Sequence, residues 1–355
     1  MNKLPPRQAT ERIIYKNILI VDGNALFKLG YCGAKNEYNS NGQHIGGLYQ
    51  FITVLRKLLN ENLYHSVYVF WDGILSGKLR YNIYPDYKGN RNKDFITGSK
   101  PEEPFYLEQQ FQVKEYLEEL FIKQLSDETV EADDFIAYIC NHKEENERIT
   151  ICSSDSDLCQ LINENVLMYH CQKKIFITKD NFFEIKGYHL DNVALIKIIC
   201  GDTTDNIKGI KGVSEKRLIE TFPILKERKV ELEEIIELAK GIQIQRKNEK
   251  KNPLKYIDNI INKVTIGCQG FNIYEINKLL VDLSNPLLTE EAKENVENLK
   301  HGYFNLEDYG GTKSVYEKMK RDGIDKKVGQ ERIGEYLMPF KKLIEREKNN
   351  NIISK

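Results

Sequence analysis

The chain has 355 residues, 41% of them hydrophobic and 30% charged, and its formal net charge of −1 excludes a globally basic nucleic-acid-binding protein. Its seven scattered cysteines contain no CxxC pair, which argues against both a disulfide framework and a zinc site. The sequence has no secretory signal and no apolar run of membrane-spanning length, so it predicts a cytoplasmic protein of one large or two modest domains.

Two short apolar runs that each end in aspartate and glycine predict parallel strands of an α/β fold. The first run covers 17–21 and ends at Asp22, and the second covers 67–71 and ends at Asp72. A helix is predicted between them, because apolar residues from 48 to 59 recur at three- and four-residue intervals. Each aspartate alone could cap a helix, but two at the same edge of a parallel sheet favour a shared site.

Residues 76–100 mix basic side chains with tyrosines, the usual composition of a surface that follows a phosphate backbone and stacks bases. The alternative is a solvated loop in which the tyrosines pack as lids. The candidate nucleic-acid contacts in this stretch are Lys78, Arg80, Tyr87, Lys88, Arg91 and Lys93. A long helix is predicted to follow, from Pro104 to about Leu125.

Five carboxylates are expected to lie at one end of a helix–strand–helix unit within residues 130–159. Glu131, Asp133 and Asp134 open a helix that continues to residue 139, and Asp155 and Asp157 follow a strand-like run over 149–152. The helix dipole explains one or two acids in a first turn, and capping explains an acid after a strand, but neither accounts for all five. This density of like charge predicts a bound cation.

The second half of the chain adds two acids and a glycine hairpin. Strands are predicted over 166–169 and 174–178, with helices over 179–186 and 191–200. Asp202 and Asp205 come next, and then a tight turn at 209–213 whose amides lead into a helix start that can hold a phosphate. A basic flank over 240–255 follows, which we interpret as a contact for duplex DNA, the alternative being a solvated loop. The candidate contacts in this half are Gly209, Lys211, Gly212, Ser214, Lys216, Arg217, Arg246 and Lys247.

Helices are predicted over 257–266 and 271–283, and the charged residues 300–355 are expected to form helices with a frayed tail. The acids lack histidine or cysteine companions, so they predict hard cations, two Mg²⁺ or Mn²⁺ about 3.5–4 Å apart that hydrolyse phosphodiesters. The predicted metal ligands are Asp22, Asp72, Glu131, Asp133, Asp134, Asp155, Asp157, Asp202 and Asp205.

In their residues and their order along the chain, these motifs resemble those of the flap endonuclease or 5′-nuclease family, especially bacteriophage 5′–3′ exonucleases and the 5′-nuclease domains of bacterial DNA polymerases. The resemblance spans about residues 17–285. The segments that carry it are Ile20–Gly23, Trp71–Gly73, Tyr87–Arg91, Val130–Asp134, Ser154–Asp157 and Gly201–Gly212. Six ordered motifs make it specific, although no single one would.

The resemblance implies a Rossmann-like (PIN-like), mostly parallel central sheet with flanking helices. It implies a nuclease core over 17–200 with a helical arch at about 76–103, and a helical helix–three-turn–helix region over 201–300 that often binds K⁺. Residues 1–16 are predicted, from their polar composition, to be an extension before this core. No role is assigned to 301–355.

The resemblance also distributes roles. Asp22, Asp72, Glu131 and Asp133 would serve one metal, and Asp155, Asp157 and Asp202 the other. Asp134 and Asp205 would lie nearby or bridge through water. Lys88 and Arg91 would stabilise the scissile phosphate, and Tyr87 would stack on the displaced nucleotide.

The implied function is a 5′–3′ exonuclease and flap endonuclease acting on DNA or RNA–DNA hybrids in replication or repair. We expect a monomer in a bacterial or phage-infected cell, with a replication partner bound through the C-terminal segment. One alternative is a catalytically inert DNA-binding protein of the same fold, which the presence of all nine acids disfavours. The other is a PIN-type ribonuclease, but such chains are shorter and lack the hairpin and basic arch.

Overall fold

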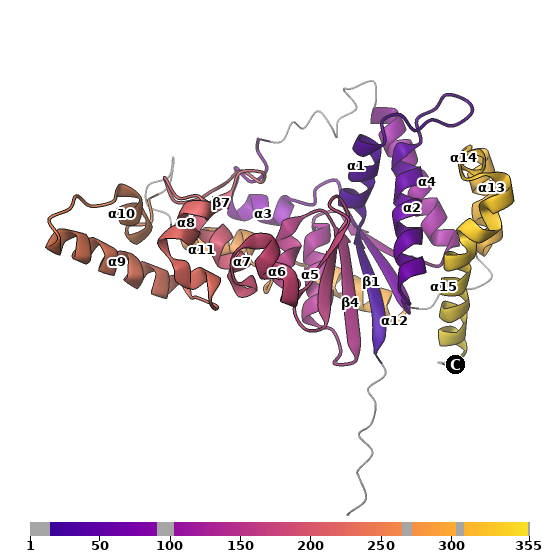
Figure 1. The fold of residues 1–355 in the computed structure, drawn as a ribbon. Coiled ribbons are helices and arrows are strands. Elements are labelled where there is room, and N and C mark those ends of the chain that lie inside the picture. Colours follow the sequence, from indigo (N-terminus) through magenta and orange to yellow (C-terminus); the bar gives the residue numbers. More distant parts are fainter. Residues whose placement is uncertain (1–14, 91–102, 265–271, 303–308, 354–355) are drawn as a thin grey trace, which may run out of the picture.

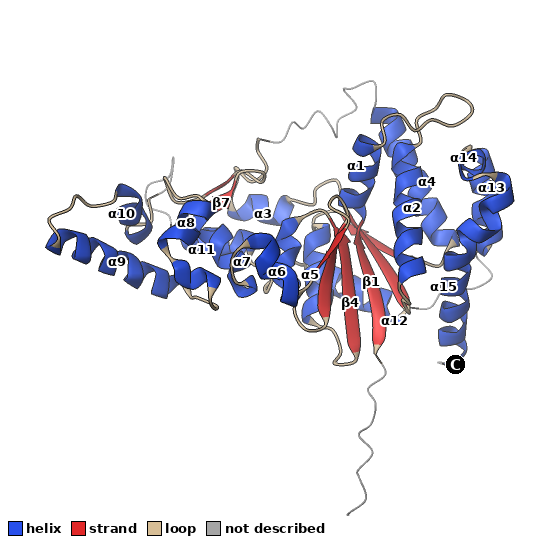
Figure 2. Cartoon of the chain, viewed as in Figure 1, coloured by secondary structure: helices blue, strands red, loops and turns tan. Residues whose placement is uncertain are grey.

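The computed structural model describes residues 15–90, 103–264, 272–302 and 309–353. At its centre lies a six-stranded sheet in the order β3-β2-β1-β4-β5-β6, parallel except for the last strand (Figures 1 and 2). The strands are β1 (Lys16–Asp22), β2 (Ser66–Asp72), β3 (Lys123–Asp127), β4 (Glu147–Ser153), β5 (Val166–His170) and β6 (Ile175–Ile177). The predicted mostly parallel α/β fold is confirmed.

The strand order shows where along the sheet a binding site is expected. The chain runs outward from β1 through β2 to β3, then returns to β4 on the other side of β1, so the direction of winding switches between β1 and β4. At that switch the carboxyl ends of strands leave a crevice, the usual binding place in open α/β sheets. Asp22 pairs in register with Phe70, and Val21 pairs with Cys152, so β1, β2 and β4 end at one level.

The sheet separates two apolar layers. Along β1, Ile18 and Ile20 belong to one buried cluster and Leu19 and Val21 to the other, as the alternation of a strand requires. The first layer includes α5 (Ala132–Asn141), α7 (Val193–Cys200) and α12 (Glu290–His301). The second includes α1 (Gly23–Gly33), α2 (Gly46–Glu61) and α4 (Glu103–Glu119).

The predicted helix from Pro104 to about Leu125 is too long at its C-terminal end. Helix α4 ends at Glu119, and Phe121 has a left-handed φ of 59°, which turns the chain into β3. The strand KQLSD is an edge strand that is only partly buried, so it has no apolar run that a sequence pattern would reveal.

The remaining helices extend the first layer away from the sheet (left in Figure 1). They are α3 (Lys78–Ile83), α6 (Lys179–Lys186), α8 (Glu215–Thr221), α9 (Leu232–Asn248), α10 (Lys255–Ile261) and α11 (Ile273–Val281), with the small hairpin β7 (Gly201–Asp202) and β8 (Ile207–Lys208) before α8. Their buried side chains join the cluster beneath the sheet, so the region after residue 200 shares one continuous core with it.

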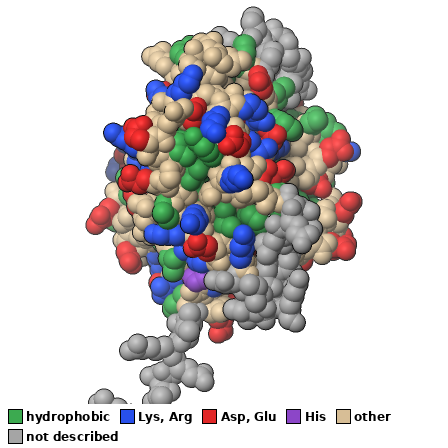
Figure 3. All heavy atoms as spheres, turned by 90° about the vertical axis from the view of Figure 1, so that its right-hand side faces the viewer, with side chains coloured by type: hydrophobic (Ala, Val, Ile, Leu, Met, Phe, Trp, Pro, Cys, Tyr) green, Lys and Arg blue, Asp and Glu red, His purple; other side chains and the backbone are tan. Residues whose placement is uncertain are grey.

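The charged C-terminal segment forms helices that complete the second layer. These are α13 (Gly311–Arg321), α14 (Ile324–Val328) and α15 (Ile333–Ile353). Val315, Met319 and Phe340 are fully buried with side chains of α2 and α4. The outward face mixes acidic and basic side chains (Figure 3). Within the described ranges, no helix combines the length and apolar character that crossing a membrane requires.

Replacing Tyr116 with phenylalanine should lower the free energy of unfolding by about 1.5–3 kcal/mol, the contribution of a hydrogen bond to a charged group. The Tyr116 hydroxyl is inaccessible and donates to Asp322 Oδ2 at 2.9 Å, which ties α4 to the end of α13. Chemical denaturation measures the change, with the 52%-exposed Tyr38→Phe as control. Equal stability of the two variants would show that this contact is not what fixes the C-terminal helices.

Candidate active site

Two aspartates at adjacent strand ends accept hydrogen bonds from backbone amides at the N-termini of α1 and α5. Asp22 is 6% exposed, and its Oδ1 accepts from the Ala25 amide at 2.9 Å while its Oδ2 accepts from Ser153 Oγ at 2.7 Å. Asp72 Oδ1 accepts from the Ala132 amide, at the N-terminus of α5, at 2.8 Å. Asp22 is thus the N-cap of α1, and the N-terminus of α5 holds Asp72 from a distant part of the chain, so both carboxylates are fixed at the sheet edge.

Asp133 and Asp155 complete what we call the carboxylate cluster: Asp22, Asp72, Asp133 and Asp155. Burial raises the pKa of Asp22 from 3.8 to about 7, and the charges of Asp72 and Asp155 add to the rise. Burial also raises the pKa of Asp133, reinforced by Asp155, Asp22 and Asp72 in that order. Burial first, and then mutual repulsion, thus favours the protonated form of both acids unless a cation joins them.

Lys197 is a partly buried cation that the sequence analysis did not identify. It lies in α7, and its Nζ bridges Asp157 and Asp202, with 2.5 Å to Asp202 Oδ2. Burial and the neighbouring Asp155 raise the pKa of Asp157 to about 7 despite Lys197. For Asp202, burial raises the pKa, but Lys197 outweighs it and holds that pKa below its usual value. The available signal was a single lysine in the apolar run VALIKIIC, five residues before Asp202.

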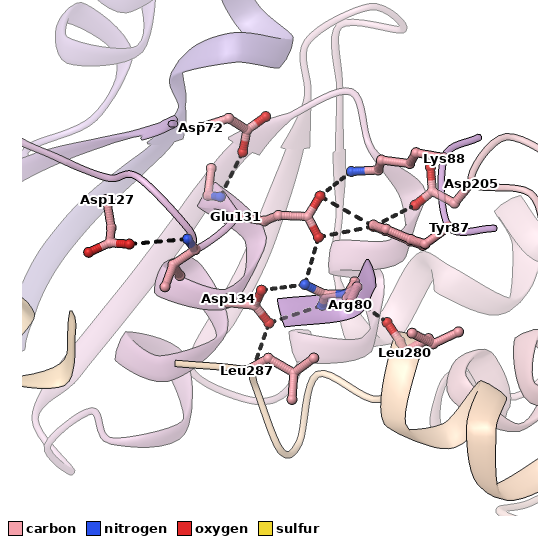
Figure 4. Close-up of polar contacts among 12 residues, drawn as sticks. Asp72, Arg80, Tyr87, Lys88, Asp127, Glu131, Asp134, Asp205, Leu280 and Leu287 are labelled. Atoms are coloured by element: carbon pink, nitrogen blue, oxygen red, sulfur yellow. Dashed lines mark hydrogen bonds and ion pairs between the residues drawn. The ribbon is translucent and has the colours of Figure 1, made fainter. Parts of the chain in front are cut away.

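Glu131 is the anchor of the segment after α3, as Figure 4 shows. Its Oε2 accepts from Arg80 Nη1 at 2.6 Å and from the Tyr87 hydroxyl at 2.9 Å, and its other oxygen pairs with Lys88 Nζ. The Tyr87 hydroxyl also lies 3.2 Å from Asp205 Oδ2. Burial raises the pKa of Glu131, but Arg80 and Lys88 outweigh it, so this carboxyl stays ionised.

Three predicted roles are wrong in this structure. Arg80 and Tyr87 are 5% and 2% exposed, so neither side chain is available to contact or stack on DNA. Asp134, at 1% exposed, accepts from Arg80 Nη1 and Nη2 at 2.5 and 3.0 Å and from the Leu287 amide at 2.9 Å. Together with Arg80 Nε, which donates to Leu280 O at 3.0 Å, it joins α3 to α5 and α11 instead of facing a metal.

A cavity of about 20 Å³, enough for one water or ion, opens between these groups. Its acidic lining is Glu131, Asp133, Asp157 and Asp205. As the side chains lie, no three carboxylate, histidine or cysteine groups in the described ranges converge closely enough to hold a metal ion. The donor set nevertheless fits a hard divalent cation, because it is all oxygen and its buried members have raised pKa values that a cation would reverse.

The predicted duplex contacts lie on the far helices. Gly212 has φ +83°, which the sharp turn requires, and Ser214 Oγ caps α8 by accepting from the Arg217 amide at 3.3 Å. A Cβ on Gly209 would meet Cys200 O at 1.9 Å, so only glycine fits there. Lys211 and Lys216 are exposed. Arg217 also donates to Gly212 O at 2.6 Å, so part of its role is internal.

Other predicted contacts differ in accessibility. Lys78, the first residue of α3, and Lys247, in the last turn of α9, are exposed. Arg246 Nε donates to Asn252 O at 2.8 Å and so closes the turn after α9. Arg91 and Lys93 lie outside the described residues.

Comparison with known proteins shows the family of this chain. The family described as 5′-3′ exonuclease, N-terminal resolvase-like domain, matches residues 17–187. A 5′-3′ exonuclease of Aquifex aeolicus is 30% identical over 206 residues, 58% of this chain and 68% of its own. The chain belongs to the 5′–3′ exonuclease family. A 5′-3′ exonuclease of Buchnera aphidicola from Schizaphis graminum is 29% identical over 291 residues, 78% of this chain and 90% of its own.

A solved structure supports the fold of this exonuclease family member over most of its length. The bacteriophage T5 D15 flap endonuclease, in a complex with DNA and metal ions, superposes with a TM-score of 0.56 at 19% identity. The superposition covers 94% of this chain and all of the T5 protein.

In the absence of metal, stability should fall as pH rises through the titration of Asp22. Its pKa is about 7 in the folded protein and near 3.8 when unfolded, so between pH 4 and 7 the folded state binds more protons. The free energy of unfolding therefore decreases with rising pH in that window. Asp22→Asn should raise the Tm of chelator-treated protein at pH 8 but not at pH 4, and the exposed Asp180→Asn should change neither. A lower Tm at pH 8 for Asp22→Asn would contradict this assignment.

Proposed function

We propose that this protein is a divalent-metal-dependent, structure-specific 5′-nuclease that hydrolyses phosphodiester bonds near the 5′ ends of DNA. The observation that carries the proposal is the carboxylate cluster at the switch point of the sheet, together with Lys88, which pairs with the neighbouring Glu131. Burial and the neighbouring carboxylates raise the pKa values of Asp22 and Asp133, and such acids beside a lysine suit phosphoryl transfer better than a purely structural role.

We assign separate roles in metal binding and phosphate binding to the residues of the site. Asp22, Asp72, Asp133 and Asp155 would hold one divalent ion, with Mg²⁺ or Mn²⁺ as the proposed species, and Asp157 and Asp202 would contribute to a second beside Asp155. Such ions activate an attacking water and stabilise the leaving oxygen of a phosphodiester. Ser153 fixes Asp22 from below, and the Ala132 amide fixes Asp72. Lys88 places a positive charge where a scissile phosphate would enter.

We assign duplex binding to the region 201–300 and the nuclease chemistry to 17–200. The exposed Lys211 and Lys216 border the turn at 209–213, and Lys247 adds a third cation on α9. We further propose K⁺ at this turn, which predicts tighter DNA binding in K⁺ than in Na⁺. A cytoplasmic monomer, action on RNA–DNA hybrids and a replication partner on the C-terminal helices are parts of the same proposal.

Changing Lys211 and Lys216 together to alanine should weaken duplex binding and lower the slope of log affinity against log salt by about 0.9 for each lost phosphate contact. Fluorescence anisotropy at several salt concentrations measures both quantities. The control variant replaces the exposed Lys313 and Lys341 on the C-terminal helices. A salt slope equal to wild type would remove these two lysines from the DNA-binding surface.

The proposed function is tested with end-labelled 5′-flap, nicked and RNA–DNA substrates, each incubated with Mg²⁺ and with a chelator. We expect metal-dependent cuts close to the junction and no cuts with the chelator. Binding without cleavage would support the inert alternative, and cleavage of single-stranded RNA in preference to the flap would support the ribonuclease alternative.

A further inference from the structure

Helix α4 is fixed to the C-terminal helices by a buried carboxylate. Asp322 is 6% exposed and accepts from Tyr116 Oη at 2.9 Å and from Gln112 Nε2 at 3.2 Å. Its backbone oxygen accepts from Asn39 Nδ2 at 3.1 Å, and Arg321 beside it donates to Glu115 at 2.8 Å. These contacts add to the apolar packing of α13 and α15, so α4 cannot shift independently of them.

A second contact fixes α4 to α2. Gln109 is 3% exposed, and its Oε1 accepts from the Gly47 and Leu48 amides at 2.9 and 3.2 Å, which are free amides of the first turn of α2. Its Nε2 donates to His44 O at 2.8 Å. A glutamine of α4 thus caps α2, and these hydrogen bonds fix α4 at residue 109 against the start of α2.

The next residue on α4 reaches the carboxylate cluster through one intermediate. Gln110 Nε2 donates to Asn24 Oδ1 at 3.3 Å, and Asn24 Nδ2 donates to Asp72 Oδ2 at 2.9 Å. The direction of this relay follows from chemistry, because an ionised carboxylate only accepts. Asn24 must turn its amino group to Asp72, and its oxygen is then left for the amino group of Gln110.

We propose that Asn24 and Gln110 are positioning residues for Asp72. The Ala132 amide holds one oxygen of Asp72 and Asn24 holds the other, so the carboxylate has a single orientation about its terminal bond. Gln110 in turn prevents the Asn24 amide from rotating. The inference rests on the proposed function, because it assigns Asp72 to binding a divalent ion. Partners that orient metal ligands in this way typically change metal affinity by 10–100-fold.

The experiment is a double-mutant cycle on Mn²⁺ binding, measured by isothermal titration of the full chain without DNA. We expect Asn24→Ala to weaken Mn²⁺ binding by about tenfold. Gln110→Ala should weaken it less, and the double variant should be no worse than Asn24→Ala, because both changes break one relay. Mg²⁺-dependent flap cleavage should require more metal in the same order.

Lys28→Ala and Glu118→Ala, exposed on the same two helices, are the controls, and thermal unfolding verifies that every variant is folded. Wild-type Mn²⁺ affinity in Asn24→Ala would overturn the inference and leave the proposed function intact. Losses that add in the double variant would overturn the relay by showing that Gln110 acts independently of Asn24. Wild-type protein that neither binds Mn²⁺ nor cuts would overturn the proposed function and the inference with it.

Discussion

Asp155→Asn is expected to abolish metal-dependent cleavage while DNA binding persists. Asp155 is exposed at the sheet edge, and its charge raises the pKa values of both Asp133 and Asp157, so it lies between the two groups of acids. Losing it removes a ligand that both proposed ions share. A bound metal supplies several kcal/mol of transition-state stabilisation, so we expect turnover to drop by at least about 10³-fold.

The isosteric change keeps the local fold. Asp155 Oδ1 accepts from the Asp157 amide at 2.8 Å, and the oxygen of an asparagine caps equally well. Single-turnover cleavage and anisotropy on the same 5′-flap substrate separate chemistry from binding, and Asp180→Asn serves as an exposed-acid control. Cleavage at the wild-type rate would mean that the ions, or the chemistry, lie elsewhere.

The parts of the site that a sequence can reveal are those encoded locally. Each strand end that carries an acid has its own signal, an apolar run followed by aspartate, and β1, β2 and β4 placed Asp22, Asp72 and Asp155 at one edge as expected. Parallel strands share their carboxyl edge by construction, so this inference needs no knowledge of side-chain contacts.

The wrong assignments concern partners that are distant along the chain. The sequence around Arg80 does not distinguish it from the other basic residues of the predicted arch. Its partner Asp134 lies 54 residues further along the chain, and only the fold brings the two together. A buried guanidinium requires such a partner, and a sequence does not disclose which basic residues are buried. The prediction for Tyr87 is wrong for the same reason, because its hydroxyl donates to Glu131, 44 residues further along the chain, and does not face solvent.

The edge strand β3 and the packing of the predicted C-terminal helices were hidden by composition instead. Lys123–Asp127 contains one apolar residue, and its place is defined by pairing with β2. In 309–353, buried residues such as Val315, Met319 and Phe340 are spaced among many charges. The sequence pattern therefore does not show that these helices pack on α2 and α4, which the structure shows.

Lys88→Ala should lower turnover by about 10²-fold, the usual effect of losing one preorganised electrostatic donor at a phosphate. The Lys88 side chain is 18% exposed, which limits solvent screening of its charge, and its backbone amide donates to Asp205 O at 2.7 Å. Glu131 keeps Arg80 and the Tyr87 hydroxyl as donors, so the fold tolerates the change. Quenched-flow cleavage measures turnover, and Lys313→Ala, exposed on the C-terminal helices, is the control. A variant that loses only DNA affinity would make Lys88 a binding residue, because a group acting on the transition state must lower turnover at saturating substrate.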